Sequence, residues 1–420
     1  MDQILIRGGN RLRGSIRISG SKNSALPIFV ASLLTNDDCL LHNVPKLVDI
    51  ITMKNLLISL GVKIRSEGRT CVLRLDKLNS FEANYESVRK MRASILVLGP
   101  LLSKFGKAEV SLPGGCAIGS RPIDLHIYAL KKMGANIKIK DGYIKGTVSR
   151  SSLKGAKIKF PKVSVGATEN TLLAASLADG ETIIENAAME PEIDDLINVL
   201  NKMGAVISRV KNNVIKIVGV EKLTGFEHKI MSDRIEAGTY AIATAITGGK
   251  VELLDAPVNN LDAVLEFLRK MGVKVKIFSQ GIIVDSPKEL NNVDLVTEVY
   301  PGFPTDLQAQ AMALMTVTNG ISKIEEKIFE NRFMHVSELM RFGAKIDVKG
   351  SKAVIKGSNN LTGAQVMATD LRASSSLVLA ALRAQGDTVI NRVYHLDRGY
   401  EDMEIKLSRC GAQVRRVHGK

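Results

Sequence analysis

Three short segments of the sequence combine residue types that suit chemistry on an anionic substrate. In GSKNSALP, Lys22 and Asn23 precede an apolar run, and in YPGFPTDLQAQ, Asp306 precedes another. The segment SLPGGCAIGSRPIDLH holds Cys116, with Arg121 five residues further on. Lysine and arginine can stabilise a phosphate, a thiol can donate a proton and a carboxylate can accept one. Together these residue types suit acid–base chemistry on a phosphorylated compound.

Cys116 lies in a different kind of segment from the other three cysteines. Gly114, Gly115 and Gly119 surround it, which is typical of a mobile lid, and Arg121 favours the thiolate. The other cysteines fit the role of small buried apolar residues. These three are Cys39, Cys71 and Cys410.

The lysine and the aspartate each have a second interpretation. Lys22 alone is more often a solvated charge, although at the positive end of a helix it would need an anion beside it. Asp306 can be a helix N-cap, or Thr305 can cap the helix and leave Asp306 free for chemistry. The residues alone leave both questions open.

Composition restricts the class of partner. Lys and Arg exceed Asp and Glu by 58 − 43 = 15, which indicates anionic ligands. Aromatic residues make up only 4% and Trp is absent, so small phosphorylated ligands fit better than single-stranded nucleic acid. There is no P-loop and no spacing of His or Cys that suits a metal. No apolar run approaches ~18 residues and no signal peptide is recognisable, so we expect no membrane insertion and a cytoplasmic protein with reduced thiols.

A motif that recurs six times organises the chain. Each copy reads as the end of an amphipathic helix, a glycine and an alternating apolar strand, as in ALKKMGANI and FLRKMGVKV. The glycines are Gly61, Gly134, Gly204, Gly272, Gly343 and Gly411. An apolar segment upstream of each, such as GTYAIATAI, is typical of a buried helix. Each repeat therefore predicts a buried helix, a strand, a surface helix and two more strands.

Polar residues just ahead of the buried helices stand 35 to 42 positions before the glycine of their repeat. If the repeats are equivalent, these residues lie at helix N-termini, which bind phosphate or carboxylate. Ordinary N-capping with solvated Lys and Arg is the alternative. The residues are Lys22, Asn23, Arg92, Thr168, Glu169, Asp233, Arg234, Asp306 and Arg372.

These segments, with KVSVGATEN, ENRFMHVSELMRFGA and DRGYEDME, resemble the UDP-N-acetylglucosamine 1-carboxyvinyltransferase family over essentially the whole chain. Ser120 and Ile123 stand where that family often has Ala and Val. The resemblance implies an enzyme that moves the enolpyruvyl group of phosphoenolpyruvate to the sugar 3-hydroxyl and releases phosphate. That reaction is the first committed step of peptidoglycan synthesis, which supports cell shape and division, and the antibiotic fosfomycin blocks it. The resemblance implies no cofactor and no metal.

The implied fold is α/β, a two-domain inside-out α/β barrel of six βαβαββ-like repeats, three per domain. One domain would span residues 22–230 and the other residues 1–21 and 231–420, with the active site in the cleft between them. The first strand would pack with the C-terminal half.

The resemblance also implies roles for individual residues. Cys116 would protonate the methylene carbon, Asp306 would accept the hydroxyl proton, and Lys22 and Arg398 would stabilise the departing phosphate. Some members of the family carry Asp at the position of Cys116. The implied substrate-binding residues are Lys22, Asn23, Arg92, Arg121, Pro122, Ile123, Asp124, Leu125, Lys162, Val163, Ser164, Val165, Asp306, Ile328, Arg372 and Arg398.

Two other functions remain to be separated from this one. The first is 3-phosphoshikimate 1-carboxyvinyltransferase, which shares the repeats but lacks the glycine–cysteine segment. The second is a non-catalytic basic scaffold that binds nucleotide or RNA. Neither the residues nor the resemblance gives the oligomeric state.

Overall fold

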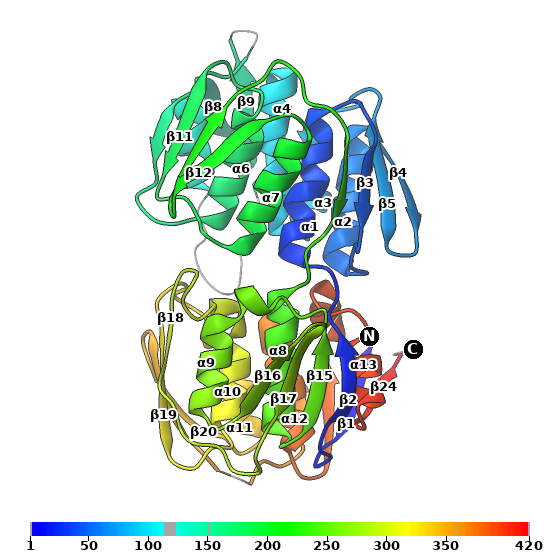
Figure 1. Cartoon of the computed structure of the whole chain (residues 1–420), viewed down its shortest axis with the longest axis vertical. Helices are drawn as coiled ribbons and strands as arrows, with labels where there is room; N and C mark the ends of the chain where they lie inside the picture. The colour runs from blue at the N-terminus through cyan, green and yellow to red at the C-terminus, as the bar shows by residue number, and fades with distance from the viewer. Residues whose placement is uncertain (1, 113–122, 150–151, 359, 419–420) are drawn as a thin grey trace. The chain divides into compact units, whose positions relative to one another are not determined.

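The computed structural model describes residues 2–112, 123–149, 152–358 and 360–418. The chain forms two compact units (Figure 1). The central unit of the sequence runs from Gly20 to Met231, and the other combines the segment up to Ser19 with the segment from Ser232 onwards. Each unit has its own hydrophobic core.

Among the described residues, each unit contains three four-stranded sheets, and all six sheets have one topology. In each sheet one edge strand pairs in parallel with its neighbour, and the other neighbours are antiparallel. In the unit from Gly20 to Met231 the orders are β14-β3-β5-β4, β6-β7-β9-β8 and β10-β11-β13-β12. In the other unit they are β16-β17-β15-β2, β18-β19-β21-β20 and β22-β23-β1-β24. The predicted α/β fold of six βαβαββ repeats is confirmed.

The strands alternate buried and exposed residues, as expected for a sheet with one face on the core. Those of the first three repeats are β3 (Cys39–His42), β4 (Val62–Glu67), β5 (Thr70–Leu75), β6 (Glu82–Ala83), β7 (Lys107–Ser111), β8 (Ala135–Lys140), β9 (Tyr143–Val148), β10 (Lys157–Lys159), β11 (Glu181–Glu185), β12 (Val206–Lys211), β13 (Val214–Val218) and β14 (Phe226–Lys229). Those of the other unit are β1 (Gln3–Arg7), β2 (Arg13–Arg17), β15 (Lys250–Leu254), β16 (Lys274–Phe278), β17 (Gly281–Asp285), β18 (Leu295–Thr297), β19 (Ile321–Glu326), β20 (Lys345–Lys349), β21 (Lys352–Lys356), β22 (Gln365–Met367), β23 (Asp387–Asn391) and β24 (Gln413–Val417).

Two strands, β2 and β14, pair with repeats that are distant from them in the sequence. β2 precedes the first repeat but pairs in parallel with β15 of the fourth. β14 precedes the fourth repeat but pairs in parallel with β3 of the first. β1 lies between β23 and β24 and completes the sheet of the sixth repeat, so the first strand packs with the C-terminal half, as the resemblance implies.

The buried helices pack against one another within their own unit. They are α1 (Lys22–Ala31), α4 (Leu98–Phe105), α6 (Val165–Ala175), α8 (Arg234–Ile246), α10 (Gln308–Met315) and α12 (Leu371–Arg383). Two of them begin with a 3₁₀ turn, η2 (Arg92–Val97) before α4 and η4 (Thr305–Leu307) before α10. All thirteen residues of α8 are buried, which its Ala- and Ile-rich sequence explains.

One predicted helix start is wrong. Thr168 and Glu169 do not precede the third buried helix but lie inside its first turns, because α6 already begins at Val165 with Ser164 as its N-cap. The hydroxyl of Thr168 donates to the carbonyl of Ser164 at 2.8 Å, and the Glu169 side chain is buried. Neither residue lies at the exposed end of a helix dipole.

The helices nearer the surface end where the glycine motif predicts. They are α2 (Val48–Leu60), α5 (Asp124–Lys132), α7 (Pro191–Lys202), α9 (Asp262–Lys270), α11 (Val336–Arg341) and α13 (Met403–Arg409). The six motif glycines all have positive φ, between 88° at Gly343 and 114° at Gly61. An L-residue rarely adopts this conformation, which explains why glycine recurs there.

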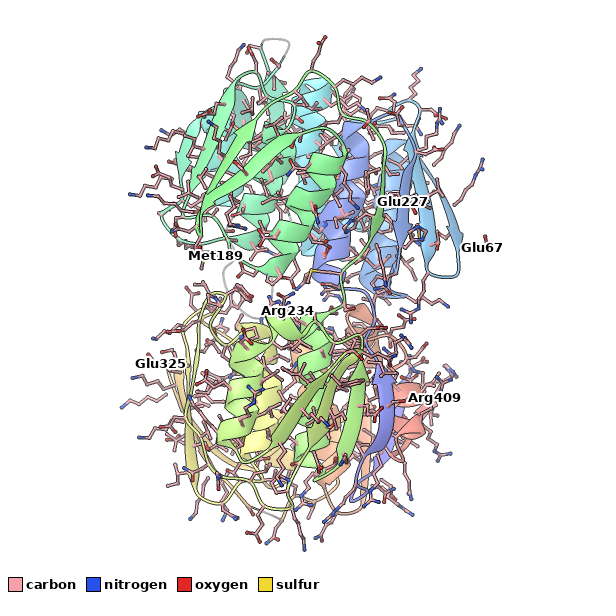
Figure 2. The ribbon with its side chains drawn as sticks, viewed as in Figure 1. Glu67, Met189, Glu227, Arg234, Glu325 and Arg409 are labelled. Atoms are coloured by element: carbon pink, nitrogen blue, oxygen red, sulfur yellow. The ribbon has the colours of Figure 1, made fainter. Side chains whose placement is uncertain are left out.

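Charged side chains project from the outer faces of both units, among them Glu67 of β4 and Arg409 of α13 (Figure 2). Among the described residues, no helix has the length and apolar character needed to cross a bilayer.

Candidate functional site

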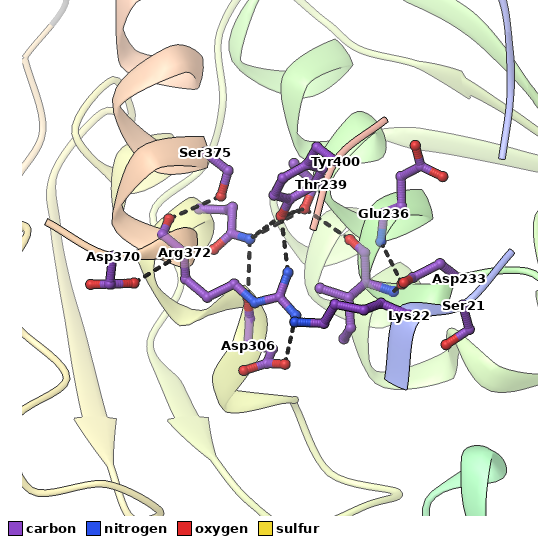
Figure 3. A network of polar contacts seen from close by, with 12 residues as sticks. Ser21, Lys22, Asp233, Glu236, Thr239, Asp306, Asp370, Arg372, Ser375 and Tyr400 are labelled. Carbon is purple, nitrogen blue, oxygen red and sulfur yellow. Dashed lines mark hydrogen bonds and ion pairs between the residues drawn. The ribbon is translucent and has the colours of Figure 1, made fainter. Parts of the chain in front are cut away.

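Asp306 is held between two arginines. Its turn, η4, leads into α10, and its carboxylate accepts from Nη2 of Arg332 at 2.8 Å and from Nη2 of Arg372 at 2.7 Å (Figure 3 shows the second contact). The side chains of Arg332 and Arg372 are only 4% and 9% exposed, and that of Asp306 is 27% exposed. Hydrogen bonds between charged groups are the strong ones, so this triad fixes the carboxylate firmly.

Neither Thr305 nor Asp306 acts as the helix cap that the sequence suggested. Pro304 stands at the cap position of η4, and no side chain caps it. The hydroxyl of Thr305 donates to Oε2 of Glu326 at 2.9 Å. The other oxygen of Glu326 accepts from the backbone N–H of Ile328 at 2.8 Å. Buried Glu326 therefore joins the turn that carries Asp306 to the turn that carries Ile328.

Arg372 lies at the start of α12, where Asp370 caps the helix by accepting from the backbone N–H of Arg372 at 2.8 Å. Burial acts to lower the pKa of Arg372, but attraction to Asp306 and Tyr400 outweighs it, so that the pKa is raised. The guanidinium therefore remains charged although it is buried. Arg398 ends the half-buried turn η5 (Val393–Arg398), which packs against α12.

Lys22 opens α1 in the other unit, directly after its N-cap Ser21. Its ammonium group lies 3.4 Å from Oδ2 of Asp49 in the first turn of α2. The two side chains are 12% and 4% exposed. The anion that a lysine needs at the positive end of a helix is thus supplied by the protein itself. Asn23 follows at the second position of α1 and is half-buried.

The segments predicted to hold the sugar nucleotide border an open groove. Its volume is about 1200 Å³ and its walls include Asp124, Leu125 and Lys159. The segment 162–165 continues directly from this wall into α6, with Lys162 exposed and Val163 half-buried. The side chain of Ser164 accepts from the backbone N–H of Ala167 at 3.3 Å, so its hydroxyl oxygen is engaged as a cap.

A buried histidine, next to Leu125 in the sequence, connects α5 to α6 and, through Asn170, to α4. Nδ1 of His126 in α5 lies 3.0 Å from the side-chain nitrogen of Asn170 in α6. Oδ1 of Asn170 accepts from the backbone N–H of Gly99 at 2.8 Å. Burial, with a smaller contribution from Arg92, lowers the pKa of His126 to about 4, so the ring is neutral at pH 7. Arg92 is half-buried at the start of η2, beside this histidine.

Three predicted site residues, Cys116, Arg121 and Pro122, lie outside the described residues. Of the others, Asp306, Ile328, Arg372 and Arg398 belong to one unit. Lys22, Asn23, Arg92, Ile123 to Leu125 and Lys162 to Val165 belong to the other. In the described part of the chain, no three His, Cys, Asp or Glu residues are grouped as metal ligands.

The family match and the most similar relatives found for this chain are all 1-carboxyvinyltransferases. Residues 6–407 match the family described as EPSP synthase (3-phosphoshikimate 1-carboxyvinyltransferase). The chain is 53% identical to the UDP-N-acetylglucosamine 1-carboxyvinyltransferase of Paramagnetospirillum magneticum, with 99% of both chains covered. It is 55% identical to the protein of the same name from Acidiphilium cryptum, with 99% of this chain and 100% of the relative covered. The chain belongs to the UDP-N-acetylglucosamine 1-carboxyvinyltransferase family.

The fold comparison agrees with this assignment. The crystal structure of the enolpyruvyl transferase NikO from Streptomyces tendae superposes with a TM-score of 0.90 at 23% identity, covering 100% of this chain and 99% of the other. As a UDP-N-acetylglucosamine 1-carboxyvinyltransferase family member, the chain is an enolpyruvyl transferase rather than a non-catalytic scaffold.

Two charged partners in this member of the UDP-N-acetylglucosamine 1-carboxyvinyltransferase family were not predicted from the sequence. Arg332 follows β19 in an irregular turn, 26 residues after Asp306, and Asp49 lies 27 residues after Lys22. Neither Arg332 nor Asp49 stands at the repeated position just ahead of a buried helix, from which other site residues were predicted. The one available signal was charge, because a buried arginine or lysine needs an anion.

Proposed function

We propose that this protein transfers the enolpyruvyl group of phosphoenolpyruvate to the 3-hydroxyl of UDP-N-acetylglucosamine and releases phosphate, the first committed step of peptidoglycan synthesis. The proposal rests mainly on the geometry of Asp306, whose partly exposed carboxylate is fixed by two buried arginines. It occurs in a chain 53% identical over its whole length to enzymes named for this transfer.

The proposed reaction needs one proton donor and one proton acceptor. The thiol of Cys116 gives its proton to the methylene carbon of phosphoenolpyruvate, and positive charge develops at the phosphate-bearing carbon. The sugar 3-hydroxyl attacks that carbon while Asp306 takes its proton, which gives a tetrahedral ketal. The thiolate left on Cys116 takes a proton back from the new methyl group, and phosphate departs with the proton held by Asp306, which restores the double bond and both side chains.

The cationic residues have the complementary task. Lys22, Arg372 and Arg398 stabilise the carboxylate and phosphate of phosphoenolpyruvate, most strongly as charge builds on the leaving phosphate. The UDP-sugar lies along the groove of Asp124 and Leu125, with Arg92 and Lys162 on its phosphates.

Phosphate release with each acceptor in turn distinguishes this function from that of a 3-phosphoshikimate 1-carboxyvinyltransferase. Purified protein with phosphoenolpyruvate should release phosphate when UDP-N-acetylglucosamine is added, and mass spectrometry should find the enolpyruvyl ether. Shikimate 3-phosphate in the same assay should give no release. The opposite pattern would make the protein a 3-phosphoshikimate 1-carboxyvinyltransferase, and release with neither acceptor would reject both assignments.

We also propose that the reaction occurs in the cytoplasm. The buried free thiols of Cys39, Cys71 and Cys410 suit a reducing compartment.

Asp49→Asn tests how Lys22 is held in the proposed site. The amide keeps the size of the carboxylate but removes the charge that holds the ammonium at a helix N-terminus. We expect the KM for phosphoenolpyruvate to rise by about five-fold, which corresponds to about 1 kcal/mol, the net contribution of one typical hydrogen bond. The KM for UDP-N-acetylglucosamine should change little. An unchanged or lower KM for phosphoenolpyruvate would show that Asp49 competes with the substrate instead of orienting Lys22.

A further inference from the structure

A buried hydroxyl lies directly behind the arginine that pairs with Asp306. The oxygen of Tyr400 is 3.4 Å from Nη1 of Arg372, on the side of the guanidinium away from its Nη2 contact with Asp306 (Figure 3). The same oxygen is 2.9 Å from Oγ1 of Thr239 and 3.1 Å from Nε2 of Gln310. Tyr400 is 2% exposed, and Thr239 and Gln310 are fully buried.

The direction of each hydrogen bond in this cluster follows from the partners. The single hydroxyl proton of Thr239 goes to the carbonyl of Ile235, 2.8 Å away in the preceding turn of α8. In the contact between the two hydroxyls, Tyr400 is therefore the donor and Thr239 the acceptor. The Tyr400 oxygen is then left to accept, and both Arg372 and Gln310 point N–H groups at it. Thr239 thus fixes Tyr400 as an acceptor for the guanidinium.

Gln310 extends the cluster to the turn that carries the proposed base. Its Nε2 donates to the backbone carbonyl of Asp306 at 3.0 Å as well as to Tyr400. Because a carbonyl can only accept, this contact fixes the orientation of the amide. One hydroxyl, that of Tyr400, is therefore connected both to the guanidinium of Arg372 and, through Gln310, to the backbone of Asp306.

We propose that Tyr400 is a positioning residue that holds Arg372 at a fixed orientation and separation from Asp306. The proposal rests on the proposed function, in which Arg372 binds phosphoenolpyruvate and Asp306 accepts the hydroxyl proton. A guanidinium recognises an anion through the plane and direction of its N–H groups, so its orientation matters as much as its charge. Tyr400 lies behind Arg372 and acts on substrate only through it.

The chain supplies a matched control for the loss of this hydroxyl. Tyr240 follows Thr239 in α8, is fully buried, and its hydroxyl has no hydrogen-bond partner in the described structure. Tyr400→Phe keeps the ring, which lies 5.9 Å from the guanidinium, and removes only the hydroxyl of the cluster. Tyr240→Phe removes an equally buried hydroxyl that holds nothing.

The test compares steady-state phosphate release for wild type, Tyr400→Phe and Tyr240→Phe. We expect Tyr400→Phe to lower kcat/KM for phosphoenolpyruvate about tenfold, with an unchanged KM for UDP-N-acetylglucosamine, and Tyr240→Phe to match wild type. The acidic limb of the pH–rate profile of Tyr400→Phe should move to higher pH, because the carboxylate loses part of its pairing with Arg372. Normal kinetics of Tyr400→Phe, or equal losses toward both substrates together with a lower Tm, would overturn the proposal.

Two further measurements keep the test decisive. If Tyr400→Phe does not fold, Thr239→Val removes the acceptor of the Tyr400 proton and should give the same loss specific to phosphoenolpyruvate. The side-chain NMR signals of Arg372, assigned with Arg372→Lys, report its orientation whether or not the enzyme turns over. Two resolved Nη signals in wild type that average in Tyr400→Phe would support the proposal, and identical spectra would overturn it. An inactive wild type would instead reject the proposed function.

Discussion

Asp306→Asn is expected to lower kcat by about 10²- to 10⁴-fold, the range in which a positioned general base contributes. The amide has nearly the same shape as the carboxylate but takes up no proton from the sugar 3-hydroxyl. Phosphoenolpyruvate should bind at least as tightly as before, because Arg332 and Arg372 lose the anion that neutralises them. Initial rates of phosphate release and calorimetric titration with phosphoenolpyruvate check the two parts separately.

The same substitution should also cost stability, which the sequence alone did not suggest. Two buried guanidinium groups that shared one carboxylate would be left without it, and breaking such a pair costs about 3–5 kcal/mol. Partial exposure of Asp306 reduces this to roughly 2 kcal/mol. We therefore expect a lower Tm together with a far larger loss of turnover.

A matched control is Asp387→Asn. Asp387 pairs with Arg7 at 2.7 Å, but both side chains are 63% exposed, so neither Tm nor rate should change appreciably. If Asp306→Asn lowers Tm while turnover stays near normal, Asp306 is a structural ion-pair partner and the proton acceptor must be sought elsewhere.

The repeats were predictable because they are encoded locally. A glycine at the left-handed end of a helix, such as Gly272, is recognisable within a short window, and so is the largely apolar segment GTYAIATAI of α8. The start of α6 was misplaced because its cap, Ser164, lies well before the apolar residues that mark the helix, beginning at Leu172. Helix boundaries are hard to predict because the capping residue is not part of the apolar pattern that marks the helix.

The ion pairs were not predictable from the same windows. Asp306 contacts Arg332 and Arg372, which lie 26 and 66 residues further along the chain. The exchange of β2 and β14 between repeats likewise joins segments more than 180 residues apart. Such contacts are set by how the elements pack, and a single sequence shows only that a buried charge will need a partner.

Cys116 is expected to be the only cysteine that an epoxide resembling phosphoenolpyruvate, such as fosfomycin, alkylates. The other three thiols are buried, and burial raises the pKa of Cys39 to about 12 and also raises the pKa of Cys410. Cys39 and Cys410 are therefore both inaccessible and protonated, and Cys71 is inaccessible. Peptide mapping by mass spectrometry should place one adduct on Cys116, and an adduct on any buried cysteine would contradict the assignment.

Substitution at this position should separate proton donation from nucleophilicity. Cys116→Ser should lower turnover by about 10²- to 10⁴-fold, because a hydroxyl is a far weaker acid than a thiol. Cys116→Asp should keep substantial activity, since a carboxyl group can also donate a proton, and should resist the epoxide. Cys410→Ala, which removes a buried thiol, should match wild type in both assays.

The pH dependence of Cys116 gives the sharpest test, because its two reactions need opposite forms of the same group. Alkylation uses the thiolate and should become faster as the pH rises through the thiol pKa, which is ~8.5 when unperturbed. Turnover uses the protonated thiol as the acid and should fall over the same range. In Cys116→Asp the fall in turnover should move to lower pH, because a carboxyl group loses its proton earlier. If turnover and alkylation instead rise together with pH, Cys116 reacts as a thiolate in catalysis, and the acid that protonates phosphoenolpyruvate is another group.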